Sequence, residues 1–287
     1  MRMRKRKLKA RLIATSCICI ILILGWFSFG PPISGQAANT KVVTVGLSSP
    51  SKGESAIWHS VAQTAKKKYN ITIKIKTFTD YNTPNKALKN GEIDLNSYQH
   101  YAFLNQWNKT NGNAIVPIAK TYIAPNRVFS KKYKSLNQLP VGTTIAVAND
   151  ATNESRALFV LKNAGLIKLK RNTVLATVND ISANPRHLKI KELEAAQTAR
   201  VISSVDATIV NNDFVEPAGL TAKETIYTEP LNKDSEKWIN VIAAKKGSQH
   251  KKIYREVVKA YQTAKTKQLF RKYFGKSQIP AWDTTLK

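Results

Sequence analysis

The sequence predicts an α/β protein in which helices alternate with mainly parallel strands. Three observations support this: short runs that alternate apolar and polar residues, longer runs with apolar residues at helical spacing, and regular alternation of the two. No fixed-period repeat or low-complexity linker follows Ala38. After an N-terminal leader, about 250 residues remain, enough for two packed lobes.

The individual elements follow from local patterns. KVVTVGL and ITIKIKT alternate as strands do, whereas Ile57, Val61 and Ala65 recur at helical spacing. Pro84 favours a helix start, and Gly91 favours a helix stop. The expected strands are Lys41–Leu47, Ile71–Thr77, Ala114–Tyr122, Thr144–Ala148, Thr173–Val178, Leu188–Leu193 and Ala207–Val210. The expected helices are Glu54–Tyr69, Thr83–Lys89, Gln99–Asn108, Thr152–Asn163 and Lys251–Phe270.

The N-terminus has the pattern of an export signal. Seven Lys or Arg among the first eleven residues precede the uncharged run Leu12–Phe29, which is also just long enough to span a bilayer. Positive-inside orientation then places the rest of the chain outside the cytoplasm. Residues 1–38 are therefore a signal peptide cleaved after Ala37, a retained membrane anchor, or a lipidated leader. Lipidation is the least favoured, because Cys17 follows only a short apolar stretch.

The cysteines and charges restrict the function classes. Cys17 and Cys19, the only cysteines, both lie in the apolar run, so the exported part has no disulfide. The formal charge is +28, or +21 without the seven N-terminal bases. The lysines are scattered and accompany no nucleic-acid-binding motif, so an anionic cell envelope explains the charge better than nucleic acid does.

The most informative stretch is Thr77–Leu104, TFTDYNTPNKALKNGEIDLNSYQHYAFL. It follows a strand, passes through a short helix and leads to a second helix that is expected to open at Tyr98, Gln99 and His100. Tyr81, Tyr98 and His100 should therefore lie near strand ends, where open α/β sheets bind ligands. These polar and aromatic groups favour holding a small molecule over transforming it, although Tyr98 could equally be a core residue.

This stretch resembles the NlpA-type lipoproteins, the methionine-binding proteins of bacterial ABC importers. Their typical strings are F-N-D-Y, P-N-x-A-L and G-x-I-D-x-N-x-F-Q-H. The resemblance continues in family order through SLNQLPVGTTIAVANDATNESRAL, AGLIKLK, ELEAAQTAR, IVNNDF and WINVIAAKK, and covers roughly residues 41–275. It implies a two-lobed type II periplasmic-binding-protein fold with a ligand cleft between the lobes. Residues 39–123 and 231–287 are expected to form lobe 1, and 124–230 lobe 2.

Arg156 is the strongest candidate for contact with an anionic ligand group. In the string Asn149–Arg156 (NDATNESR), Asp150 or Thr152 can cap a helix whose first turns carry Arg156. Free N–H groups and the helix dipole favour an anion there, and a guanidinium adds bidentate carboxylate recognition. Spacing alone would favour a surface or domain-bracing arginine, whereas the resemblance implies a contact with the ligand carboxylate.

The resemblance implies further ligand contacts. Asn211 and Asn240 align with asparagines that the family places at the ligand, and an amide can serve both charges of a zwitterion. Asn153 is similar, or else it serves the helix start. Tyr81 and His100 would line the part of the pocket that holds the ligand's side chain, or His100 would support the pocket structurally. Ala124 replaces a family aromatic residue and would enlarge the pocket.

The resemblance implies a partner as well as a ligand. The ligand would be methionine, a related amino acid or a short peptide, delivered to an ABC permease with a cytoplasmic ATPase. No cofactor, metal or nucleic acid is expected. An enzyme is disfavoured, because the exported part has no G-x-S-x-G, HExxH, phosphate loop or Cys–His set. The alternative is a cell-surface adhesive or structural protein with no transport role.

Overall fold

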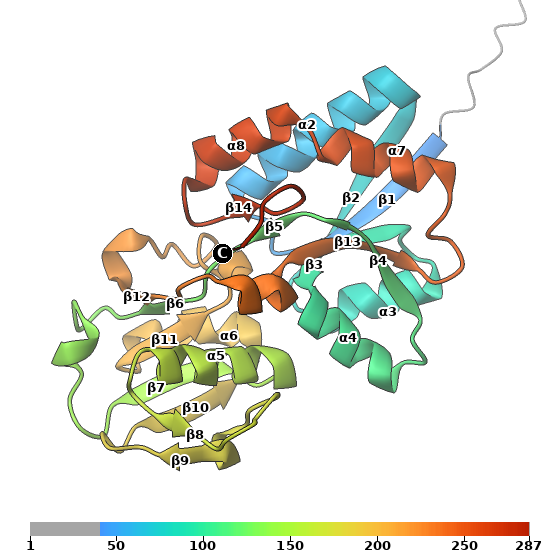
Figure 1. Ribbon diagram of the computed structural model, residues 1–287. Coiled ribbons are helices and arrows are strands. Elements are labelled where there is room, and N and C mark those ends of the chain that lie inside the picture. Colours follow the sequence, from blue (N-terminus) through green and yellow to red (C-terminus); the bar gives the residue numbers. More distant parts are fainter. Residues whose placement is uncertain (1–40, 287) are drawn as a thin grey trace, which may run out of the picture. The chain divides into compact units, whose positions relative to one another are not determined.

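Two five-stranded sheets organise the chain in the computed structural model, which describes residues 41–286 (Figure 1). The expected leader, residues 1–38 with Cys17 and Cys19, lies outside the described residues. Within the described part, no helix combines the length and apolar character needed to cross a bilayer.

The first sheet has the strand order β2-β1-β3-β13-β4. Its strands are β1 (Lys41–Ser48), β2 (Ile71–Phe78), β3 (Leu95–His100), β4 (Ile115–Lys120) and β13 (Asn240–Lys245). One face packs through a core around Trp58, Ile57 and Phe270 against helices α2 (Lys52–Tyr69), α7 (Lys252–Tyr261) and α8 (Ala264–Phe274) (Figure 1). A second core around Leu88 and Leu104 packs the helices α3 (Thr83–Asn90) and α4 (Tyr101–Thr110).

The second sheet has the strand order β10-β7-β11-β6-β12. Its strands are β6 (Arg127–Phe129), β7 (Thr144–Ala148), β10 (Lys189–Leu193), β11 (Ala207–Val210) and β12 (Thr225–Thr228). Helix α5 (Ala151–Asn163) packs on it through a core that includes Val147, Leu158 and Ile209, and α6 (Ala195–Arg200) packs beside β11.

Short elements complete the described chain. The small two-stranded sheets pair β5 (Tyr122–Ile123) with β14 (Ile279–Pro280) and β8 (Lys168–Leu169) with β9 (Ile181–Ala183). The 3₁₀ helices are η1 (Leu136–Gln138), η2 (Val178–Asp180), η3 (Val201–Ser203), η4 (Asn212–Phe214), η5 (Ala222–Glu224) and η6 (Lys233–Trp238).

Local sequence explains the helix boundaries nearest the pocket. The Asp150 side chain accepts a hydrogen bond from the N–H of Asn153 and so caps α5. The carboxyl end of α3 is closed by Gly91, whose φ of 81° suits glycine. His100 caps α4, because its Nδ1 accepts from the N–H of Phe103.

The α/β class and the two-lobed fold are confirmed, but several expected details are wrong. The sheets are mixed, because the returning strands β13 and β6 pair antiparallel with both of their neighbours. Residues 95–100 form the buried strand β3, so the second helix starts at Tyr101 and not near Tyr98. Residues 173–177 form no strand, and η2 begins at Val178.

The expected helix over 251–270 is instead two helices. Thr263 caps α8 by accepting from the N–H of Thr266, which lets the chain turn between α7 and α8. The chain changes sheet between β4 and β6 and returns between β12 and β13. Lobe boundaries at 123/124 and 230/231 stay predictions.

Candidate functional site

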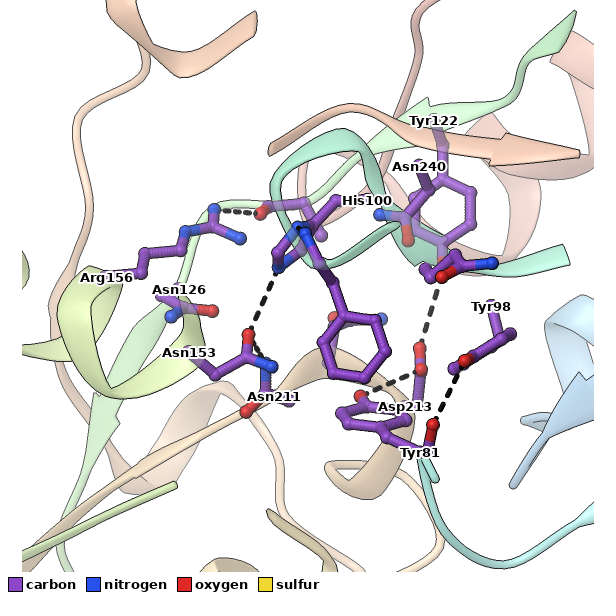
Figure 2. Close-up of a pocket in the computed structure, with 14 residues that line it drawn as sticks. Tyr81, Tyr98, His100, Tyr122, Asn126, Asn153, Arg156, Asn211, Asp213 and Asn240 are labelled. Carbon is purple, nitrogen blue, oxygen red and sulfur yellow. Dashed lines mark hydrogen bonds between the residues drawn. The ribbon is translucent and has the colours of Figure 1, made fainter. Parts of the chain in front are cut away.

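Side chains from both halves of the fold, one half around each five-stranded sheet, line a pocket (Figure 2). All six residues expected from the sequence line it: Tyr81, His100, Asn153, Arg156, Asn211 and Asn240. The other lining residues are Tyr98, Gln99, Phe103, Tyr122, Ala124, Asn126, Asn212 and Asp213.

Arg156 is fixed by a buried ion pair that the sequence did not reveal. Its Nε donates to both carboxylate oxygens of Glu229 at 3.2 Å, and Nη2 donates to Oε2 of Glu229 at 2.6 Å and to the carbonyl of Ala124 at 2.8 Å. The guanidinium also lies 4.9 Å from the centre of the Trp238 ring. Arg156 therefore braces the chain crossings, which was the alternative interpretation of this residue.

The same arginine keeps a free edge toward the pocket. Among the residues that the structure describes, none accepts a hydrogen bond from Nη1 of Arg156, and Arg156 lines the pocket. Nη1 carries two donor hydrogens, so it can still bind an anionic oxygen. The bonds to Glu229 and Ala124 hold the guanidinium in one orientation for such a contact.

Asn153 is the centre of a hydrogen-bonded cluster at the start of α5. Its Oδ1 lies 3.2 Å from Nε2 of His100 and accepts from Nδ2 of Asn211 at 2.7 Å, and its own Nδ2 donates to Asp150 at 2.8 Å. Asn153 is thus largely committed to protein partners. This leaves the side-chain oxygen of Asn211 as the amide acceptor for a ligand on this side.

His100 is a neutral, oriented side chain. Because its Nδ1 accepts from the backbone N–H of Phe103, the ring proton must lie on Nε2, which then donates to Asn153. Burial, together with the nearby charge of Arg156, lowers the pKa of His100 to about 3. His100 therefore braces the pocket and contributes no positive charge to it at neutral pH.

Aromatic rings form the opposite side of the pocket. Tyr81 lies with its ring centre 5.7 Å from that of Tyr98 and 5.9 Å from that of Phe103. The hydroxyl of Tyr98 donates to the carbonyl of Tyr81 at 3.0 Å. Tyr98, left open as a core residue, is both buried and pocket-lining. This wall suits an apolar or thioether side chain.

An acid that the sequence reasoning missed sits beside this wall. Asp213 accepts from the hydroxyl of Tyr81 at 2.9 Å and from that of Tyr122 at 3.3 Å. Burial raises the pKa of Asp213 to about 7, although the two hydroxyl donors oppose the shift. Its position two residues after Asn211 in IVNNDF was the signal that could have identified it.

Asn240 and Ala124 complete the pocket from the two chain crossings. Asn240 opens β13, directly opposite His100 in the strand pairing, and its side chain lines the pocket. Ala124 contributes both its carbonyl to Arg156 and a small side chain to the pocket wall. Across residues 41–286, no set of three or more His, Cys, Asp or Glu side chains is arranged to hold a metal.

Comparison with known proteins places the chain in a family. The sequence profile of the NlpA lipoproteins matches residues 43–282. The chain belongs to the NlpA lipoprotein family. A relative in Mannheimia haemolytica, named outer membrane lipoprotein 3, is 39% identical over 86% of this chain and 93% of its own.

Two solved structures are similar to the chain. The substrate-binding protein of a methionine transporter from Streptococcus pneumoniae is 43% identical, with a TM-score of 0.80, over 84% of this chain and 96% of its own. A nutrient-binding protein from Burkholderia cenocepacia, bound to methionine, is 40% identical, with a TM-score of 0.79, over 83% and 99%. The two-lobed fold and the family resemblance are thereby confirmed.

Proposed function

We propose that this protein binds methionine in the pocket around Arg156 and delivers it to an ABC importer. The observation that carries the proposal is the pocket itself: one cationic edge, asparagine side chains and an aromatic wall, in a chain 40% identical to a methionine-bound relative. The ligand carboxylate would accept hydrogen bonds from Nη1 of Arg156. The side-chain amides of Asn211 and Asn240 would form hydrogen bonds with the charged groups on the α-carbon. Tyr81 and His100 would lie along the side chain.

The partner follows from the class of binding protein. Delivery requires an ABC permease with a cytoplasmic ATPase, and the basic and apolar leader would keep the protein at the outer face of the membrane as an anchor or lipidated segment. A binding protein releases its ligand unchanged, so no catalytic residue is assigned.

Titration calorimetry with a panel of amino acids tests the function. We expect saturable heat with methionine, no turnover, and much weaker heat with acidic amino acids, because their side-chain carboxylate would face the aromatic wall and the acid Asp213. In cells, deletion of the gene should lower methionine uptake where no second binding protein is present. Absence of binding to every amino acid would favour the adhesive or structural alternative.

Ala124 is expected to set the size of the ligand side chain. Replacing it with tyrosine should fill pocket volume and change the preference among methionine, leucine and a methionine-containing dipeptide by roughly tenfold or more. Calorimetry with the three ligands measures the preference, and thermal melting reports stability. Ala124→Val should give a smaller change in the same direction. Equal losses for all three ligands, or unfolding, would show that Ala124 does not shape the pocket.

A further inference from the structure

Asp213 is the buried acid of this pocket that no basic side chain neutralises. It lies in η4, is only 7% exposed, and lines the pocket. Its two carboxylate oxygens accept from the neutral hydroxyls of Tyr81 and Tyr122. Among residues 41–286, no Lys, Arg or His nitrogen lies within ion-pair distance of it.

The charge balance of the pocket is therefore uneven. The positive charge of Arg156 is matched by Glu229, with both side chains buried. The carboxylate of Asp213 has no such match, and the other acid near it, Glu54 at the start of α2, would add negative charge. Burying an ionised carboxylate without a counterion is unfavourable in free energy. A cation that binds beside Asp213 would offset much of this unfavourable free energy.

Figure 2 shows Arg156 and Asp213 on opposite sides of the pocket. We propose that Asp213 is the receptor for a positively charged nitrogen of the ligand, and we assign that nitrogen as the α-ammonium group. This assignment rests on the proposed function. A carboxylate offers about four lone-pair sites, and the two tyrosine hydroxyls use two of them. An ammonium group, with three donors, fits the sites that remain.

Asp213 contacts the aromatic wall through the hydroxyl of Tyr81. An α-carbon beside Asp213 would therefore place the ammonium group on the carboxylate and the side chain along the rings of Tyr81, Tyr98 and Phe103. Tyr81 and Tyr122 orient the carboxylate from the first-sheet half, while Asp213 belongs to the second-sheet half.

If Asp213 binds the ammonium group, the affinity for methionine depends on the ionisation of its carboxyl group and therefore on pH. Burial raises the pKa of Asp213 to about 7, and burial followed by the charge of Asp213 raises the pKa of Glu54 well above its ordinary value. The hydroxyls of Tyr81, Tyr98 and Tyr122 have pKa values well above 10, so they stay neutral.

An ammonium ion favours ionised Asp213, so below about pH 7 binding must expel a proton from it. Affinity for methionine should then rise as pH increases toward 7 and level off above it, by at most roughly tenfold per pH unit. A ligand without the ammonium group should show no such rise, because it does not stabilise the carboxylate.

A comparison of ligands and variants tests the assignment. Wild type and Asp213→Asn are titrated with methionine and with 4-(methylthio)butanoic acid, which lacks only the amino group, and with lysine and norleucine. We expect wild type to prefer methionine over the deaminated acid, and Asp213→Asn to lose roughly tenfold or more of that preference. Asp234→Asn, an exposed acid outside the pocket, is the matched control and should keep the preference.

The outcomes separate the two proposals. If wild type binds methionine but Asp213→Asn keeps the full preference, the assignment of Asp213 is overturned and the proposed function stands. If wild type prefers lysine over norleucine and loses that preference in Asp213→Asn, Asp213 is a cation receptor but for a side-chain ammonium, and methionine is the wrong ligand. Binding of none of the four ligands overturns both.

The pH profile provides evidence that does not depend on a variant. Should Asp213→Asn fail to fold, wild type is titrated with methionine and with the deaminated acid from about pH 5 to pH 8, a range that spans the titration of Asp213. A rise with pH for methionine alone supports the assignment, and parallel profiles for the two ligands overturn it.

Discussion

Replacement of Arg156 by alanine is expected to weaken methionine binding by roughly 2–5 kcal/mol, as for a truncated partner of a buried charge pair. The loss removes the free Nη1 edge that faces the pocket. It also leaves Glu229 buried without its cation, so the variant should melt at a lower temperature. Calorimetry gives the affinity, and thermal melting separates it from the loss of stability.

Arg156→Lys refines this test, because it keeps the charge but loses the planar fork that contacts Glu229 and Ala124 together. We expect intermediate binding. Arg186→Lys is the matched control: Arg186 donates to the carbonyls of Leu136 and Leu139, away from the pocket. An unchanged dissociation constant in folded Arg156→Ala would remove Arg156 from the ligand contacts.

Replacement of Glu229 by alanine is expected to destabilise the fold by roughly 3–5 kcal/mol, because Arg156 would remain as an unpaired buried charge. Glu229 also accepts from the backbone N–H of Asn126 at 2.8 Å, so it ties α5 to both chain crossings. Chemical denaturation without ligand measures the effect. Methionine should restore more stability to this variant than to wild type, because its carboxylate supplies the missing negative charge.

A double variant identifies the source of the loss. Arg156→Met combined with Glu229→Met should be much less destabilised than the sum of the single changes, because no unpaired charge remains. The control Glu92→Ala removes an exposed ion pair with Lys76 and should change stability little. Additive losses in the double variant would show that the pair contributes no coupling.

The sequence predicted the pocket residues better than the strand arrangement around them. Asp150, Asn153 and Arg156 lie in one helix start, so local capping rules fix their relative positions. The helix expected to open at Tyr98, Gln99 and His100 falls in the second half of β3, whose six residues, LNSYQH, are mostly polar yet all buried. Two of these side chains, Asn96 and Gln99, are hydrogen-bonded to each other and to Asn85 of α3, in a network that no periodicity reveals.

The Arg156–Glu229 ion pair and the role of Asp213 could not be predicted from the sequence for a different reason. Glu229 meets Arg156 across 73 residues, and Asp213 meets Tyr81 across 132. Neither spacing carries a local signal, because both contacts depend on how the two sheets face each other. In the same way, the mixed pairing of β13 and β6 depends on returns of the chain that local patterns do not encode.

Mass spectrometry of the small molecules released by denaturing the purified protein identifies the ligand that the pocket holds. We expect methionine, at up to about one molecule per chain as for a single binding site, from wild type and little or none from Arg156→Ala. Release of a different compound, or of equal methionine from both proteins, would contradict the assignment of this pocket as a methionine site built around Arg156.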